Sequence, residues 1–489
     1  MVPTNRGSLA VSICQPRKDV LGAVLILSAA AVFALFLGLI AAILPWFILL
    51  PLAIIPLGLV VAWRMPELAL LALMAAAFGV IPEYLLPRLP VAGGLLRLED
   101  AGIFVMLAVL LVRNMGSMSE AFRPLISYVW PIGMLVLLAA LSAALSIGMK
   151  GVEIRDVFQE LRPFAYWVWL PTLMLAVRTS TQMRRFLLGL ALLTVVTSLL
   201  LMFQSFTGSS IMTKGQAMRD LYTLGDVHRG VIRTTSPASF LIVAVLMFLL
   251  ASFAVATDWV RTVIVITLSL VLIGGVLVGF GRGIWFSAFL GVLLLAYFVR
   301  TVKYSGVLLV LGASISIGIS ILALTNYGYV TAAYDRIFSV RGEVEYGSSF
   351  DRRRSENAAA IKAITQNPIL GVGLGAEYML LNSETMAWEA GTRYIHNAYL
   401  GALLKLGPFG LVLVIWLTAV AIWRPWLAAR ERSPDFPVHF AALWALLAVL
   451  IFTAMTQRNI MATHGVLTIC LAIFVSEWTR RYGLSGNRE

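Results

Sequence analysis

The chain has 489 residues, 60% hydrophobic and only 12% charged, with a mean hydropathy of +0.91. Soluble domains carry about 25% charged residues, so this composition excludes an ordinary soluble domain and indicates an integral membrane protein. The net charge of +13 comes from basic residues scattered between apolar runs. This scatter points to anionic lipid headgroups or an anionic lipid-linked substrate rather than to nucleic acid. The two cysteines, Cys14 and Cys470, are too far apart in sequence to suggest a disulfide framework or a Cys-X-X-Cys metal site.

A membrane-spanning helix needs about 20 apolar residues. Fourteen runs meet or approach that length: 20–41, 43–63, 67–86, 101–112, 127–147, 164–177, 186–206, 237–257, 262–280, 284–299, 306–324, 397–423, 438–456 and 460–477. We therefore predict an all-α polytopic membrane protein with about 14 transmembrane helices. The range is 12–14, because the runs at 101–112, 164–177 and 284–299 are short.

The basic residues predict how these helices are oriented, because Lys and Arg gather in cytoplasmic connections. With the N-terminus in the cytoplasm, every second connection and the C-terminal tail are basic, so both termini are predicted to be cytoplasmic. The predicted divisions of this one membrane domain are residues 1–324 with helices 1–11, a large outer loop at 325–395 containing short helices, and residues 396–489 with helices 12–14. An outer segment at 148–162, GMKGVEIRDVFQELR, is expected to form a short amphipathic helix.

The outer loop gathers charge and helix breakers in one place. A helix is predicted over 351–366, ended by Asn367-Pro368. Its first turn holds Arg352, Arg353 and Arg354, where cations oppose the helix dipole at a cost of a few tenths of a kcal/mol each. Such a cost indicates an anion site, and a solvated or lipid-contacting face is the alternative.

A glycine-rich turn follows, with Gly371, Gly373 and Gly375 spaced as G-x-G-x-G. This spacing, without a βαβ unit around it, is not a dinucleotide fingerprint. The glycines permit close approach of another group. That group is either a ligand or, equally well, the membrane domain itself if the loop folds back.

His396 stands just before the apolar helix that begins near Asn397. The positive end of that helix favours the neutral imidazole, which can accept a proton at pH 7. A general base placed against a hydroxyl contributes on the order of 10²–10⁴-fold in rate. The alternative is a histidine that caps the helix. His228 and His464 also fall on the predicted outer side, and only context separates them from His396.

Arg282 lies in the tight turn GFGRGIW between two apolar runs, with no acidic residue nearby in sequence. A charge at membrane depth usually has a function, although the side chain could also extend to the interface. Arg229 and Arg233, in HRGVIRTTSPAS, form a comparable pair. Guanidinium groups bind phosphate bidentately. Because no cluster of outer carboxylates suggests a metal site, we predict an arginine-based site with no metal and no cofactor.

Three strings resemble the O-antigen ligase and polymerase superfamily. They are the run from Arg354 through NPILGVGLG to HNAYLGALLKLGPFG, the turn GFGRG, and HRGVIRTTSPASFL. Together they cover about residues 225–415. One departure is Gly281, where the family turn often has Ser before the arginine.

The resemblance implies a GT-C-like glycosyltransferase of the bacterial inner membrane, acting at the periplasmic face on a glycan carried by undecaprenyl pyrophosphate. By analogy, His396 activates an acceptor hydroxyl that attacks the anomeric carbon with inversion, while Arg282 and an arginine of the 229–233 loop hold the pyrophosphate. The other residues expected to contact substrate are Arg352, Arg353, Arg354, Gly371, Gly373, Asn397 and Tyr399.

Members of the superfamily are ligases, which transfer glycan to lipid A-core, or polymerases, which join repeat units, and a related branch glycosylates protein. Fourteen helices favour a polymerase of O-antigen or exopolysaccharide. The expected partners are the lipid-linked glycan, a glycan or lipid A-core acceptor, and the bilayer, with a chain-length regulator or a flippase as further candidates. A transporter or flippase of lipid-linked sugars is the alternative class. The near absence of charge at the helix centres counts against it, because carriers place ionisable groups there.

Overall fold

The computed structural model describes residues 56–81, 88–91, 94–118, 122–208, 218–220, 232–234, 236–255, 258–299, 312, 316, 327–338, 349–381, 388–430, 443, 446–447, 450–451, 453–455 and 459–482. The chain divides into two units, Met1–Arg64 and Met65–Glu489. In the first, residues 56–64 are helical. All the elements below belong to the second unit.

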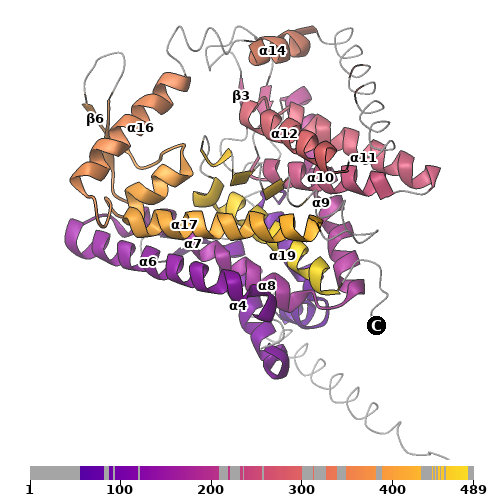
Figure 1. Cartoon of the computed structure of the whole chain (residues 1–489), viewed down its shortest axis with the longest axis horizontal. Coiled ribbons are helices and arrows are strands. Elements are labelled where there is room, and N and C mark those ends of the chain that lie inside the picture. Colours follow the sequence, from indigo (N-terminus) through magenta and orange to yellow (C-terminus); the bar gives the residue numbers. More distant parts are fainter. Residues whose placement is uncertain are drawn as a thin grey trace, which may run out of the picture. The chain divides into compact units, whose positions relative to one another are not determined.

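Helices dominate the second unit (Figure 1). Those of eight residues or more are α3 (Pro66–Ala77), α4 (Leu98–Arg113), α6 (Ile126–Lys150), α7 (Ile154–Ala165), α8 (Trp169–Ala176), α9 (Ser180–Thr207), α10 (Ser239–Val255), α11 (Trp259–Leu277), α12 (Arg282–Val299), α14 (Tyr327–Phe338), α16 (Ser349–Gln366), α17 (Ala398–Arg430) and α19 (Thr463–Tyr482). Shorter 3-10 turns include η4 (Tyr166–Val168) and η6 (Asn459–Met461). The helical class predicted from the sequence is confirmed.

Three antiparallel hairpins, which the sequence did not lead us to expect, accompany the helices in the described part of the chain. They pair β1 (Arg88–Val91) with β2 (Gly94–Arg97), β3 (Met218–Asp220) with β4 (Ile232–Thr234), and β5 (Tyr378–Leu381) with β6 (Trp388–Thr392). Their strands have three to five residues. Strands this short carry too little period-2 alternation to be separated from loop by pattern.

Among the described residues, four helices are long and apolar enough to cross a membrane: α6, α9, α11, and α17 as far as Leu427. They correspond to the runs predicted at 127–147, 186–206, 262–280 and 397–423. Shorter apolar helices occur in α3, α10 and α12. The runs at 20–41 and most of 306–324 and 438–456 lie outside the described residues, so the count of fourteen stays a prediction.

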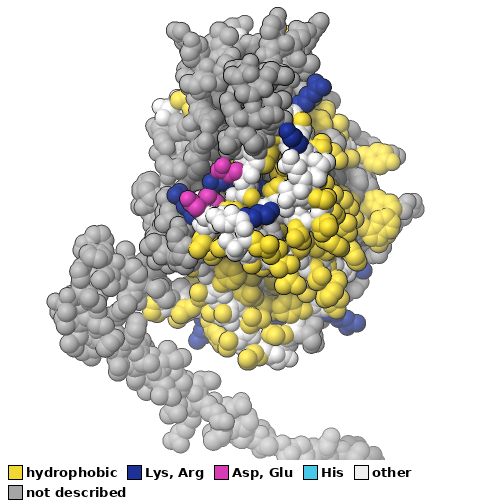
Figure 2. Space-filling view, turned by 90° about the vertical axis from the view of Figure 1, so that its left-hand side faces the viewer, with side chains coloured by type: hydrophobic (Ala, Val, Ile, Leu, Met, Phe, Trp, Pro, Cys, Tyr) yellow, Lys and Arg dark blue, Asp and Glu magenta, His cyan; other side chains and the backbone are white. Residues whose placement is uncertain are grey.

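The outward faces of these helices indicate that lipid surrounds them. On α6, Trp130, Leu137 and Leu141 are 68%, 63% and 50% exposed. Figure 2 shows a broad apolar surface on the face it presents, with basic and acidic side chains at its edge. Soluble monomers rarely expose so much contiguous apolar surface. The chain is therefore a multi-pass membrane protein.

Helix α17 organises the part of the fold that carries the loop at 349–395. It packs along α6, as Figure 1 shows, and also contacts α16 and α19. Gly407 (φ 70°) breaks α17 near its start, with Pro408 next in sequence. At its far end Arg424 pairs with the buried Glu477 of α19, which also accepts a 3.1 Å hydrogen bond from Tyr128 of α6.

The amphipathic helix predicted within 148–162 is confirmed as α7, which begins at Ile154 and ends at Ala165. Its buried residues include Val157 and Phe164, while Ile154 and Phe158 are exposed. It contacts α6, α19 and β2. Helix α7 thereby forms one wall beside the start of α17, where the candidate site lies.

Candidate functional site

His396 is paired with a carboxylate that the sequence analysis missed. Its Nδ1 atom lies 2.7 Å from Oε2 of Glu356, a residue of α16 forty positions earlier. The Glu356 side chain is 3% exposed, whereas the His396 side chain is 49% exposed. The carboxylate is thus fixed inside the protein, and the imidazole reaches from it to the surface.

The contacts of Glu356 fix the proton arrangement on the imidazole. Oε2 of Glu356 also accepts the backbone N–H of His396 at 3.3 Å. Because a carboxylate oxygen is an acceptor, Nδ1–H donates to it, so in the neutral imidazole Nε2 is the nitrogen that carries the lone pair. A buried carboxylate that orients a histidine in this way is the usual arrangement for a general base.

The helix after His396 has its own cap. Oδ1 of Asn397 accepts the backbone N–H groups of Tyr399 and Leu400, at 3.1 and 3.0 Å. Asn397 is therefore the N-cap of α17, while His396 is turned towards Glu356. The Tyr399 hydroxyl donates to the carbonyl of Ile451 at 3.2 Å. Binding of substrate by Asn397 and Tyr399 stays a prediction.

The three consecutive arginines lie in the first turns of α16, whose end at Gln366 matches the predicted boundary. Residues three apart share a helix face, so Arg353 is on the face that carries Glu356. Arg353 is half-buried and Arg354 is exposed. The side chain of Arg352 lies outside the described residues.

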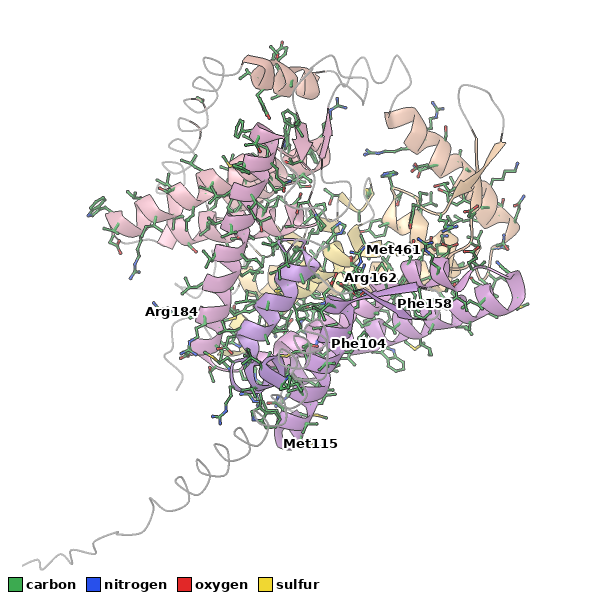
Figure 3. All side chains as sticks on the ribbon, turned by 180° about the vertical axis from the view of Figure 1, so that it is seen from behind. Phe104, Met115, Phe158, Arg162, Arg184 and Met461 are labelled. Atoms are coloured by element: carbon green, nitrogen blue, oxygen red, sulfur yellow. The ribbon has the colours of Figure 1, made fainter. Side chains whose placement is uncertain are left out.

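Of the remaining predicted arginines, Arg282 belongs to a different group of helices. Arg282 is the first residue of α12, which contacts α10 and α11 and lies across the molecule from α16 in Figures 1 and 3. The turn before it contains Phe280 at a positive φ of 43°, packed against Tyr329. Arg229 and the side chain of Arg233 lie outside the described residues.

The glycine-rich loop packs against two helices. A Cβ atom at Gly371 would lie 2.4 Å from the carbonyl oxygen of Leu404 in α17, and one at Gly373 would lie 2.3 Å from Oγ of Ser146 in α6. Between them, the backbone N–H of Val372 donates to that same Leu404 carbonyl at 2.7 Å. The loop therefore folds back onto α6 and α17, and substrate binding by Gly371 and Gly373 stays a prediction.

Ion pairs tie α7 to this region. Lys405 of α17 contacts Oε2 of Glu160 at 3.0 Å, and the same oxygen accepts the N–H of Gly375 at 2.7 Å. Arg393, just after β6, pairs with Asp156 and with Glu377. A lysine inside the apolar run 397–423 is a signal that sequence reading could have used, because such charges are rare and usually paired.

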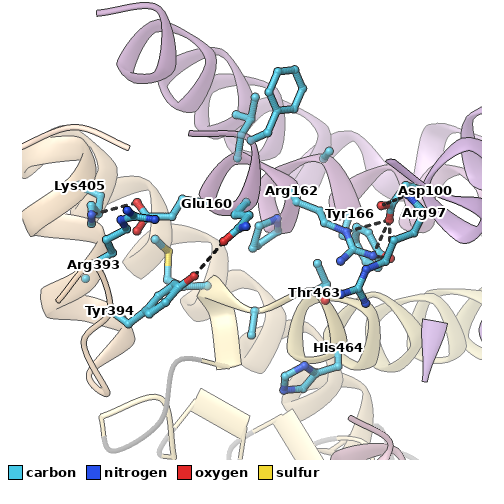
Figure 4. A pocket seen from close by; sticks show the side chains of 18 of the residues that line it. Arg97, Asp100, Glu160, Arg162, Tyr166, Arg393, Tyr394, Lys405, Thr463 and His464 are labelled. Carbon is cyan, nitrogen blue, oxygen red and sulfur yellow. Dashed lines mark hydrogen bonds and ion pairs between the residues drawn. The ribbon is translucent and has the colours of Figure 1, made fainter. Parts of the chain in front are cut away.

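A cavity of about 720 Å³ lies between α7 and the residues next to His396. Its lining comes from Arg97 and the start of α4, from α7, from residues 393–395 with the first turns of α17, and from residues 461–464. Figure 3 shows Phe158, Arg162 and Met461 near one another, and Figure 4 shows Tyr394 and His464 facing the same space. The His464 ring also stacks on Phe240, with 6.5 Å between centroids.

Burial and nearby charges shift the pKa values of several groups around this cavity, among them Glu160 and Tyr378. Burial raises the pKa of the Glu160 carboxyl, and the Lys405 ammonium opposes part of that rise. Burial also raises the pKa of Tyr378, and the Glu356 and Glu160 carboxylates raise it further. The Tyr378 phenol therefore stays protonated, and it donates to the Tyr394 carbonyl at 3.0 Å. Tyr378 lies close to both the His396–Glu356 pair and the cavity wall.

No cluster of three or more His, Cys, Asp or Glu side chains suited to a metal ion occurs among the residues that the structure describes. The polar groups around His396 are instead paired with one another.

Residues 267–415 match the family model for O-antigen ligase, and this segment holds the Arg282 turn, the α16 arginines, the glycine-rich loop and the His396–Glu356 pair. The match is narrower than the resemblance over 225–415, and leaves out Arg229 and Arg233. No curated protein matches the chain. Residues 267–415 are thus similar to the O-antigen ligase family, and this match supports the resemblance to the superfamily of O-antigen ligases and polymerases.

Proposed function

We propose that this protein is an inner-membrane glycosyltransferase that takes glycan from undecaprenyl pyrophosphate at the periplasmic face. The observation that carries the proposal is the His396–Glu356 pair, 2.7 Å apart within the O-antigen ligase segment. A buried carboxylate and a half-exposed imidazole suit the removal of a proton from an alcohol. The assignment to ligase- or polymerase-type chemistry comes from the family.

In the proposed reaction, Nε2 of His396 accepts the proton of an acceptor hydroxyl as that oxygen bonds to the anomeric carbon. The bond from the anomeric carbon to the pyrophosphate oxygen breaks, so the sugar inverts and the lipid diphosphate leaves with the electron pair. Glu356 holds the imidazole and stabilises the imidazolium that forms. The atoms and electrons of this step balance without an oxidant, a reductant or a metal.

Arginines are the proposed partners of the departing diphosphate. Of the two α16 arginines whose side chains the structure describes, Arg353 is the better placed, since it lies on the Glu356 face and is half-buried. Arg282 is proposed for the same charge from its turn in the sequence, although α12 lies across the molecule from α16. Arg229, Arg233, Arg352 and Arg354 remain further candidates. A fold with 14 transmembrane helices of GT-C type and cytoplasmic termini belongs to the same proposal.

Electrophoresis of surface glycan from a strain lacking this protein distinguishes the candidate activities. We favour a polymerase of O-antigen or exopolysaccharide, which predicts the loss of long-chain ladders with single repeats still attached to core. A ligase predicts glycan stranded on its lipid carrier. Repeat units trapped on the cytoplasmic side of the membrane would instead support a flippase and contradict the proposal.

Arg282→Lys tests bidentate phosphate binding. We expect turnover to fall by about 10²–10³-fold, because lysine keeps the charge but loses the two parallel donors of the guanidinium. Initial rates with purified lipid-linked glycan give the measurement. The matched control is Arg261→Lys, at an exposed arginine near the start of α11, which should leave the rate unchanged. Equal rates for Arg282→Lys and wild type would contradict phosphate binding by Arg282 and leave it only the role of anchoring the turn at the membrane interface.

A chelator tests whether the proposed chemistry is independent of metal. We expect turnover in excess EDTA to equal turnover without it, because arginine side chains supply the positive charge. The measurement is product formation before and after chelation, followed by addition of Mg²⁺ or Mn²⁺. A loss that a divalent cation restores would overturn this part of the proposal.

A further inference from the structure

The cavity next to His396 has a balance of charge that identifies its ligand class. Five cations line it: Arg97, Arg155, Arg162, Arg393 and Lys405. Three of them are paired with five carboxylates: Arg162 with Glu99 and Asp100, Arg393 with Asp156 and Glu377, and Lys405 with Glu160. Of these carboxylates, Asp100 and Glu160 also line the cavity. Ion pairs therefore neutralise three of its five cations, which favours an uncharged ligand over a diphosphate.

The uncharged part of the lining suits a saccharide. Phe104, Phe158 and Tyr394 line the cavity and are 49%, 48% and 43% exposed. Aromatic side chains with a few fixed polar groups are the usual lining of small-molecule sites. The polar groups include Gln159, whose Oε1 accepts a 3.4 Å hydrogen bond from the Tyr394 hydroxyl. Amides, phenols and paired arginines present both donors and acceptors, which match sugar hydroxyls.

The size and position of the cavity agree with this ligand. Its volume of about 720 Å³ lies within the range of about 300–1,000 Å³ for ligand sites, large enough for a short run of sugar residues. Tyr394 and Ile395 line it and directly precede His396, while Gly401 lines it just after the start of α17. A sugar held there lies beside the proposed base.

We propose that this cavity binds an uncharged saccharide, with Phe158 and Tyr394 as its main contacts and with the diphosphate bound elsewhere. The proposal rests on the proposed glycosyl transfer, whose substrates contain sugar on both the acceptor and the donor. It adds a binding site built largely from α4 and α7, outside the segment at 267–415 that matches the family.

Saccharide binding to the full-length protein in detergent tests the proposal without any transfer. The probe is the uncharged fraction of oligosaccharides released by mild acid from the surface polysaccharide of the cells that make the protein. Saturation-transfer NMR reports the bound sugar and gives its Kd. We expect Phe158→Ala to raise Kd by about five- to tenfold, and Tyr394→Phe by about two- to tenfold.

The matched control is Phe289→Ala, at a phenylalanine of α12 that is 61% exposed and not part of the cavity lining. It should leave Kd unchanged. Thermal unfolding checks each variant, and Tyr394→Phe, which removes one oxygen from an exposed side chain, covers the case in which Phe158→Ala does not fold. Failure of the wild-type protein to bind, or an equal Kd in Phe158→Ala, Tyr394→Phe and wild type, would overturn the proposal.

Competition and kinetics separate the remaining possibilities. Inorganic pyrophosphate should not displace the saccharide, and displacement would assign the cavity to the diphosphate and overturn the proposal. In transfer assays, a raised KM for the acceptor in Phe158→Ala identifies acceptor sugar as the occupant, and a raised KM for the lipid-linked glycan identifies donor sugar. Glycan transfer by a protein whose cavity binds no saccharide would contradict this inference but not the proposed function. Saccharide binding without any glycan transfer would contradict the proposed function but not this inference.

Discussion

Replacing His396 with Ala is expected to lower the rate of glycan transfer by about 10²–10⁴-fold, the usual contribution of a general base. The reason is geometric. Glu356 fixes the imidazole through Nδ1 at 2.7 Å, and no neighbouring group in the proposed mechanism takes over the free Nε2 position. The loss should appear in kcat, because the proton is removed in the chemical step.

Initial rates with purified protein and lipid-linked glycan measure this effect. Glu356→Gln is the companion variant, and it should cause a smaller loss, because the amide keeps the shape of the side chain but does not stabilise an imidazolium. Gln366→Ala, at the exposed end of α16, is the control and should behave as wild type. Full activity in correctly inserted His396→Ala would remove this residue from the reaction.

Gly371→Ala is expected to lower the free energy of unfolding by about 2–5 kcal/mol. Gly371 has a φ of +69°, which costs a residue with a side chain about 1–2 kcal/mol. Its added Cβ would also lie 2.4 Å from the Leu404 carbonyl, a backbone atom that cannot rotate away. Moving that carbonyl would disturb its 2.7 Å hydrogen bond from Val372, so strain and a weakened hydrogen bond add together.

Unfolding of the purified protein in detergent gives the measurement, with Gly133→Ala as the matched control. Gly133 lies within α6, and a Cβ there would meet nothing within 4 Å. That variant should lose no stability, since alanine is the better helix former. If Gly371→Ala proved as stable as Gly133→Ala but bound substrate poorly, the loop would have a binding role instead of the packing role.

The helices were predictable from the sequence to the extent that their signals are local. Apolar runs with short charged ends gave α6, α9, α11 and α17, because length and hydropathy suffice to specify a span. The Asn367-Pro368 pair likewise predicted the end of α16. The hairpins were not predicted, because their strands are too short to show a clear alternation. The break at Gly407 was not predicted either, because it depends on how the backbone of α17 fits against the glycine-rich loop, and sequence spacing does not reveal that fit.

The candidate site was predictable in part, for a related reason. His396 carries a local signal, namely its place before a helix, but its partner Glu356 stands forty residues earlier in a turn dominated by arginine. Pairing across that distance depends on how α16 lies against α17. Glu160 and Lys405 escaped notice for the same reason, since each looks like an isolated charge until α7 and α17 are brought together.

The wall of the cavity and the proposed reacting pair, His396 and Glu356, are encoded in separate stretches of the chain. Much of the wall comes from α4 and α7, before residue 170, whereas His396 and Glu356 lie in the segment shared with the family. If the cavity binds saccharide as proposed, mutations in the early helices alter which sugar is accepted without changing the proposed reacting pair. Under the proposed function, exchanging the front of the gene alone would then be enough to change the polysaccharide that is made.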